Sequence, residues 1–100
     1  MKRLFVAAFM FLAVLTTNTL AEIKMGVILG FTGPIESLTP AMAASAELAF
    51  KEVSDSGALL GGETITPIRG DSTCIDSAAA QTVAEDLISQ GVAAIMGADC

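Results

Sequence analysis

IKMGVILGFTGPIESLTP, residues 23–40, is the stretch of sequence that decides the fold of this chain. Residues 23–29 are mostly apolar and predict a buried strand. Residues 30–39 are rich in turn formers and predict a loop, and Pro40 suits the first turn of a helix because its missing N–H costs nothing there. A strand that runs through a glycine-rich loop into a helix is how open α/β proteins form a ligand crevice. We therefore expect half of a binding site at this loop.

The segment after this loop predicts a helix that begins at Pro40 and ends before Gly57. Thr39 is expected to cap its free amides, and Gly57 suits the left-handed conformation that follows a helix. Glu47 and Lys51 lie one turn apart and are expected to pair weakly on the outer side. An apolar stripe at helical spacing is expected to face the sheet, and its members are Met42, Ala46, Ala49, Phe50 and Val53.

A second strand, a second helix and a third strand follow in order. Residues 63–69 predict a strand at the edge of a sheet, because Pro67 cannot donate to a ladder. Residues 70–75 predict a loop, and Asp76 or Ser77 is expected to cap the next helix, which closes at Gly91. Residues 92–97 are continuously apolar and predict the third strand. The buried face of the second helix is expected to consist of Ala80, Val83, Ala84, Leu87 and Ile88.

The order β-α-β-α-β predicts an α/β fold with three parallel strands, because crossover connections are right-handed. The edge character of the second strand favours the spatial order 2-1-3, with residues 23–29 in the middle. A crevice then opens beyond the carboxyl ends of the first and third strands. Its walls are expected to be the loop of residues 30–39 and the residues that follow Ala98.

The first twenty-one residues have the pattern of a secretory signal peptide. Lys2 and Arg3 form a basic start, residues 4–15 are apolar, and Ala21 provides a small side chain at the expected cleavage point. The alternative is a membrane anchor. Twelve helical residues cover roughly 18 Å, which is short of a bilayer core of about 30 Å. We therefore expect domain boundaries of 1–21 for the signal and 22–100 for the exported part.

The exported part is strongly acidic. It contains three basic and eleven acidic residues, which gives a net charge of −8. Such a surface argues against nucleic acid or anionic lipid as a partner. The chain has no histidine, so Ser-His and Cys-His catalytic pairs and histidine metal ligands are excluded.

Two cysteines, Cys74 and Cys100, are present. An exported chain reaches an oxidising compartment, in which an even number of cysteines favours a structural disulfide. Two buried free thiols are the alternative. The spacing is far from Cys-x-x-Cys, so a zinc or thioredoxin-like role has little support.

The glycines of the first loop resemble a dinucleotide fingerprint only superficially. Gly26, Gly30 and Gly33 have the spacing G-x-x-x-G-x-x-G instead of G-x-G-x-x-G, and residues 34–39 separate the last glycine from the helix. A phosphate cradle needs helix amides directly after the glycines. Nucleotide binding is therefore the weaker hypothesis, and no cofactor is expected.

Polar residues in the loops have two possible roles. The hydroxyls of Thr32, Ser37 and Thr39 can hydrogen-bond a ligand carboxylate or satisfy their own loop. Asp71 is better explained as a turn former and Asp76 as a helix cap than as metal ligands beside Asp99, so no metal site is expected. The methionines within apolar patterns are expected to fill the core; they are Met25, Met42 and Met96.

The chain resembles the amino-terminal part of the periplasmic leucine/isoleucine/valine-binding proteins, the receptors of ABC importers. The resemblance rests on residues 23–27 as first strand, Thr32-Gly33-Pro34, residues 49–52 (AFKE), the Gly61-Gly62 turn, and a framework of Asp71, Cys74, Gly91, Gly97 and Cys100. It covers essentially all 100 residues. It implies a type I periplasmic-binding fold, a disulfide between Cys74 and Cys100 near the cleft, and a non-enzymatic protein.

The resemblance also implies a free branched-chain amino acid as ligand, a membrane permease as partner and a periplasmic location. Leu38 matches the position at which the family often places an aromatic side chain over the ligand, so it is expected to give apolar contact. We expect Thr32, Ser37 and Asp99 to be the other ligand contacts from this part of the chain.

The family has two lobes, and the matched residues cover part of one. We therefore expect this sequence to be a fragment or a truncated product. Two alternatives stay open beside the importer hypothesis. One is a product that binds no ligand by itself, and the other is a small exported α/β nucleotide-binding protein.

Overall fold

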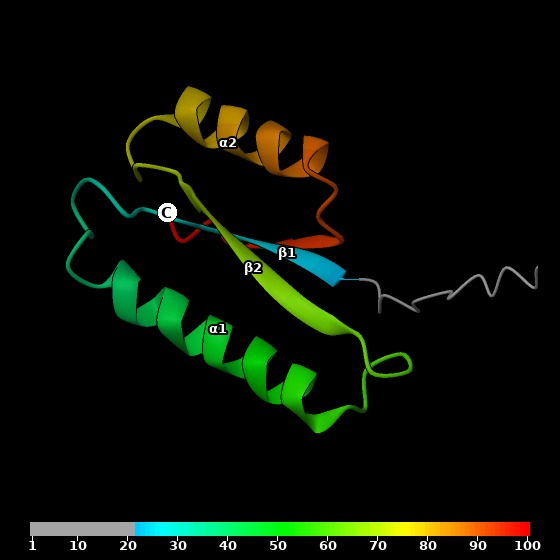
Figure 1. Cartoon of the computed structure of the whole chain (residues 1–100). Helices are drawn as coiled ribbons and strands as arrows, with labels where there is room; N and C mark the ends of the chain where they lie inside the picture. Colours follow the sequence, from blue (N-terminus) through cyan, green and yellow to red (C-terminus); the bar gives the residue numbers. More distant parts are fainter. Residues whose placement is uncertain (1–21) are drawn as a thin grey trace, which may run out of the picture.

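The computed structural model describes residues 22–100 as a three-stranded sheet with one helix on each face (Figure 1). The strands are parallel and lie in the order β2-β1-β3, which confirms the predicted α/β fold and strand order. The predicted signal peptide, residues 1–21, lies outside the described residues. The elements along the chain are β1 (Glu22–Leu29), α1 (Thr39–Ser56), β2 (Thr64–Asp71), α2 (Ser77–Ser89) and β3 (Ala94–Met96).

Strand β1 is the centre of the sheet. Its whole length pairs with β2, from Glu22 beside Thr64 to Leu29 beside Asp71. On its other side, residues 25–27 pair with β3. The carboxyl half of β1, residues 26–29, is buried. Because all three strands are parallel, the loops that leave them emerge at the same edge of the sheet.

The face of the sheet that α1 covers holds a small apolar cluster. Val27 and Leu29 point to this side and pack with Ala43 of α1, and Phe31 and Phe50 lie against them. Ala43 is fully buried, and its small side chain lets the helix approach the strand closely. The predicted stripe is wrong at three positions, because Met42 and Val53 remain 44% and 43% exposed and Ala49 is exposed too. The fully buried position is Ala43, one residue after the predicted Met42.

The opposite face is covered by α2, and two glycines let this helix approach the strands closely. A Cβ atom at Gly70 would lie 2.3 Å from Cγ1 of Val83, and one at Gly26 would lie 3.0 Å from Cδ1 of Leu87. Leu87 is 2% exposed and fills the space above these glycines. Ile88, predicted to be buried, is 64% exposed, because the stripe that faces the sheet is narrower than the apolar pattern.

The helix starts differ in how they are capped. Asp76 caps α2 as predicted, since Oδ1 accepts from the amides of Ala78 and Ala79 at 2.9 and 3.1 Å. The predicted cap at Thr39 is wrong. Thr39 is the first residue of α1, the cap position is Leu38, and no side chain caps this helix. The Thr39 hydroxyl donates instead to the carbonyl of Gly30 at 3.0 Å.

Three further predictions need correction in detail. Strand β2 continues through Asp71, two residues beyond the predicted end, because β1 continues to pair with it. Strand β3 contains only three residues instead of six. The expected pair of Glu47 with Lys51 does not form, because Arg69 binds Glu47 and Lys51 binds Asp55 one turn on.

Neither helix within residues 22–100 is long and apolar enough to cross a membrane.

Replacing Leu87 tests the packing of α2. We expect Leu87→Ala to lower the free energy of unfolding by about 2–5 kcal/mol, because it removes a fully buried side chain and leaves a cavity against the sheet. The matched control is Ile88→Ala on the same helix, which we expect to change it by about 0.5 kcal/mol or less. Urea denaturation of the purified variants measures both values. Equal losses for the two variants would contradict the orientation of α2.

Candidate functional site

The loops that follow the three strands meet at the carboxyl edge of the sheet, and we call this edge the rim. It consists of residues 30–38 after β1, residues 72–76 after β2 and residues 97–100 after β3. The amide of Ser72 donates to the carbonyl of Leu29 at 3.0 Å, so the first two loops begin side by side. Parallel α/β sheets place ligands at this edge.

Gly30 joins the first and third loops. Its amide donates to both carboxylate oxygens of Asp99, at 3.1 and 3.3 Å. Its carbonyl accepts from the Thr39 hydroxyl, which is completely buried. Both polar groups of this peptide are therefore satisfied by side chains from distant positions, and Asp99 holds the end of β3 against the end of β1.

Asp71 joins the first and second loops. Thr32 donates to it twice, from Oγ1 to Oδ2 at 2.6 Å and from the amide to Oδ1 at 3.2 Å. The amide of Thr73 donates to the same Oδ1 at 2.8 Å. These bonds favour the ionised form, and the hydrogen bond from Thr32 is the largest cause that lowers the pKa of Asp71 below its ordinary value. Asp71 was predicted as a turn former in a loop; it is the last residue of β2, and its carboxylate holds both the loop that follows it and the neighbouring first loop.

The first loop needs a glycine where it crosses the second loop. Gly33 has a backbone φ of 97°, which residues other than glycine rarely adopt. A Cβ atom there would lie 2.4 Å from the carbonyl oxygen of Thr73. The two loops therefore touch through their backbones at this point.

A cluster of three side chains fixes the base of the first loop, and none of its contacts was predicted. Arg69 of β2 donates from Nε to Oε1 of Glu47 at 2.6 Å and from Nη2 to Oε2 at 2.9 Å. Its guanidinium also lies 5.3 Å from the centre of the Phe31 ring. The hydrogen bond from Arg69 lowers the pKa of Glu47, and the same bond raises the pKa of Arg69. This cluster ties the loop to α1 and β2 together.

Cys74 and Cys100 form a disulfide, with their Cα atoms 5.3 Å apart. This confirms the prediction made from the export of the chain and from its two cysteines. The bond connects the loop after β2 to the loop after β3. Asp99 directly precedes Cys100, so the disulfide and the Asp99–Gly30 hydrogen bonds hold the same short segment.

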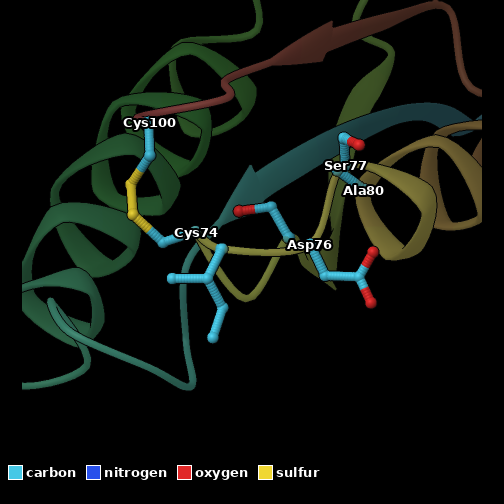
Figure 2. A pocket seen from close by; sticks show the side chains of 7 residues that line it. Cys74, Asp76, Ser77, Ala80 and Cys100 are labelled. Atoms are coloured by element: carbon cyan, nitrogen blue, oxygen red, sulfur yellow. A yellow bond between two sulfur atoms is a disulfide. The ribbon is translucent and has the colours of Figure 1, made fainter.

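A hollow of about 230 Å³ lies beside this disulfide (Figure 2). The figure shows the sulfur bridge on one side and the start of α2, with Ser77 and Ala80, on the other. Within residues 22–100, Ser72 has the one buried side-chain oxygen that makes no hydrogen bond. The hollow is lined by Ser72, Cys74, Ile75, Asp76, Ser77, Ala80 and Cys100.

The four predicted ligand contacts do not line this hollow. Thr32 and Asp99 lie at the rim, but each is bound to another part of the protein. Ser37 and Leu38 are exposed at the end of the first loop, and the Leu38 side chain is 61% accessible. Their contact with a ligand stays a prediction.

Ser72 and Ser77, which line the hollow, were not predicted as candidate site residues. The signal for them was available, because the predicted order 2-1-3 already places the end of the second strand beside the end of the first. The described part of the chain brings no three cysteine, aspartate or glutamate side chains together in a way that suits a metal ion.

The chain was compared with models of known protein families. The family model described as periplasmic binding protein matches residues 22–99, which is nearly the whole of the described part. No curated protein matches the sequence.

Acidification tests the Asp71 contacts. Because the pKa of Asp71 is lowered in the folded state, its contribution to stability is present above the pKa of the unfolded chain and is lost as the pH falls through the folded value. We expect Asp71→Asn to lower the free energy of unfolding at pH 7. At a pH far below about 3.9, the ordinary pKa of an aspartate, the same substitution should lower it much less. Urea denaturation across this range measures the difference. Glu52→Gln on the exposed side of α1 is the control. A difference between wild type and Asp71→Asn that does not change with pH would contradict this role.

Reduction tests the disulfide. The two cysteines are separated by 26 positions, and closing a loop of this size stabilises a folded chain by about 3–4 kcal/mol in the chain-entropy model. We expect the double variant Cys74→Ser, Cys100→Ser to lose about this much, and dithiothreitol to lower the stability of the wild type but not of the variant. Thermal unfolding with and without dithiothreitol measures both. An unchanged transition in the reduced wild type would contradict the expectation.

Proposed function

This chain belongs to the periplasmic binding protein family, and we propose that it is the solute-binding component of an ABC-type importer of amino acids. The family is typically non-enzymatic. Its members bind small solutes and in general work with an ABC permease. The amino-acid class of the solute, and the leucine, isoleucine and valine group within it, are our proposal.

The convergence of three loops at one rim is the observation that carries this proposal. Residues 30–38, 72–76 and 97–100 come together there, and the hollow lies between the second of these loops, Cys100 and the start of α2. The positions of these loops are set by the hydrogen bonds from Gly30 to Asp99 and from Thr32 to Asp71, and by the Cys74–Cys100 disulfide. A site whose groups are fixed before binding loses little entropy when a small ligand arrives.

The aliphatic class of amino acid is supported by the sequence resemblance and by Leu38. This side chain is 61% exposed at the end of the loop after β1. Ligand sites combine apolar walls with a few polar groups that fix orientation. We propose that Leu38 contacts the aliphatic side chain of the solute, and that Thr32, Ser37 and Asp99 border its polar end.

Export to the periplasm is part of the proposal. The pattern of residues 1–21 supports it, and so does the Cys74–Cys100 disulfide, because such bonds persist in oxidising compartments. We propose further that a second lobe supplies the opposite wall of the site, as the resemblance implies, with residues 22–100 supplying the first wall.

A nucleotide-binding role finds no support in the geometry of the first loop. The Gly30 amide, which a phosphate would need, already donates to Asp99. Helix α1 begins only at Thr39, so its free amides do not follow the glycines directly.

Calorimetric titration tests the proposed function. We expect heats of binding when leucine, isoleucine or valine is added to the purified protein, and none with ATP. Leu38→Ser should lower the affinity for leucine more than the affinity for glycine, because the substitution removes only an apolar contact with the side chain of the ligand. Glu52→Gln, away from the rim, is the control and should change neither. Binding of ATP without any response to amino acids would refute the proposal. A protein that binds none of these solutes would support the alternative that this chain does not bind ligand by itself.

A further inference from the structure

We propose that the Cys74–Cys100 disulfide is a redox latch of the rim. A dithiol opens this bond in the folded protein, and the opening frees residues 98–100 and weakens solute binding, while the sheet and both helices stay folded. For an exported chain, the latch couples solute binding to oxidation after export. The effect on solute binding rests on the proposed function, whereas the effect on the rim does not.

The disulfide lies where a small reductant can reach it. Both cysteines line the hollow beside α2, and Figure 2 shows the sulfur bridge along one side of it. Cys100 is exposed and Cys74 is half-buried. Exchange begins when a thiolate reaches a disulfide sulfur, so access decides whether the bond is reduced in the folded state. A small dithiol therefore has a path to this bond without unfolding of the chain.

The chemical step is thiol–disulfide exchange with a dithiol as the reductant. One thiolate of the dithiol attacks a sulfur of the bridge, the sulfur–sulfur bond breaks, and the other cysteine leaves as a thiolate and takes up a proton. The second thiolate of the dithiol then attacks the mixed disulfide and releases the first cysteine, which is protonated in turn. Two electrons and two protons pass to the protein, and the dithiol becomes a disulfide.

Few other contacts hold the segment that the disulfide secures. Strand β3 pairs only with residues 25–27 of β1, and residues 97–100 follow its end. Within residues 22–100, these four residues make no backbone–backbone hydrogen bond. Apart from the disulfide, the polar contact that ties them to another loop is the Asp99 carboxylate, which accepts from the Gly30 amide. Once the covalent link is broken, this contact alone holds Asp99 at the rim.

Gly97 is the point at which the released segment begins. Its φ is 121°, and a Cβ atom there would collide with the carbonyl group of Ile28, so its backbone lies against β1. A glycine also adopts the other backbone conformations that a moving segment needs, because it has no side chain. Residues 98–100 can therefore turn about Gly97 while β3 stays paired with β1.

The loop on the other side of the disulfide is strained. Thr73 and Cys74 have φ values of 59° and 68°, in the left-handed region that residues other than glycine rarely adopt. Such conformations persist where the surrounding contacts enforce them. Beside the disulfide, these contacts are the Thr73 amide on Asp71 and the Asp76 amide on the Thr73 hydroxyl. Breaking the covalent contact lets Cys74 relax, which favours separation of the two sulfurs.

The contacts that hold the sheet together come from other parts of the chain. Strand β1 pairs with β2 along its whole length. Val27 and Leu29 pack against α1, and Leu87 of α2 is buried on the opposite face. None of these three residues belongs to the two loops that the disulfide joins. Opening of the rim therefore requires less free energy than unfolding of the whole chain.

The rate of reduction tests the access of the bond. Oxidised protein is mixed with dithiothreitol at constant pH, and the released thiols are alkylated and counted by mass. We expect the rate to rise in proportion to the dithiothreitol concentration, and to be unchanged by urea below the unfolding transition. A rate that levels off at the rate of unfolding would overturn the proposal, because the bond would then be reached only in the unfolded chain.

Nuclear magnetic resonance of the nitrogen-15-labelled protein tests the release of the segment. We expect reduction to lower the backbone order parameters of Ala98 and Asp99 from about 0.85 to below about 0.6, and to shift the amide signal of Gly30. The signals of Val27 and Leu87 should stay in place. Unchanged order parameters at Ala98 and Asp99 would overturn the latch, and so would a collapse of the whole spectrum to that of an unfolded chain.

The double variant Cys74→Ser, Cys100→Ser is the matched control for the reagent. We expect its spectrum to resemble that of the reduced wild type and to be unchanged by dithiothreitol. A response of the variant to dithiothreitol would show that the reagent acts elsewhere, and would overturn the assignment to this disulfide. If the variant does not fold, the spectrum of the reduced wild type decides the question by itself.

Leucine separates the latch from the proposed function. We expect reduction to weaken leucine binding by at least about tenfold, because apparent affinity falls with the fraction of protein whose rim is formed, and oxidised glutathione to restore it. If reduction frees residues 98–100 and leucine binds neither form, the effect on the rim stands and the proposed function fails. If leucine binds both forms equally, the function stands and the latch is overturned.

Discussion

The parallel pairing of β1 with β2 on one side and β3 on the other is the constraint on which the rest of the structure depends. The register places Leu29 beside Asp71 and Val27 beside Met96, so three chain segments that are distant in sequence end at the same edge. Every contact of the rim requires this alignment. A shift of one residue would reverse the faces of β1, and would expose the valine and leucine that now pack with Ala43.

The acidic side chains of the rim hold its loops and the start of α2 in place. Asp99 accepts from the amide of Gly30, Asp71 accepts from Thr32 and Thr73, and Asp76 caps α2. Charged acceptors make stronger hydrogen bonds than neutral ones, which suits loops with few apolar contacts. The consequence is a rim that is both rigid and negatively charged. Its order is built into the fold.

The regular elements were predictable because they follow from local patterns. Buried β1, the Pro67-containing edge strand, the Asp76 cap and the strand order 2-1-3 all come from periodicity, capping chemistry and the handedness of crossovers. The boundaries were less predictable. The end of β2 is set by the length of its partner β1, and the three-residue β3 pairs with β1 only along residues 25–27, which no local pattern within 92–97 shows.

Taken by itself, the sequence determined an acidic chain with an α/β order, a central first strand and two cysteines suited to a disulfide, and it predicted export. Only the tertiary structure decided which polar groups bind one another. Arg69 pairs with Glu47, and the Thr39 hydroxyl donates to the Gly30 carbonyl instead of capping its helix. The Ser72 hydroxyl makes no hydrogen bond within residues 22–100. The physical reason is that a strand or helix pattern depends on near neighbours in the sequence. Hydrogen-bond partners depend on distances of a few ångströms between loops, and these are fixed only when the sheet has formed.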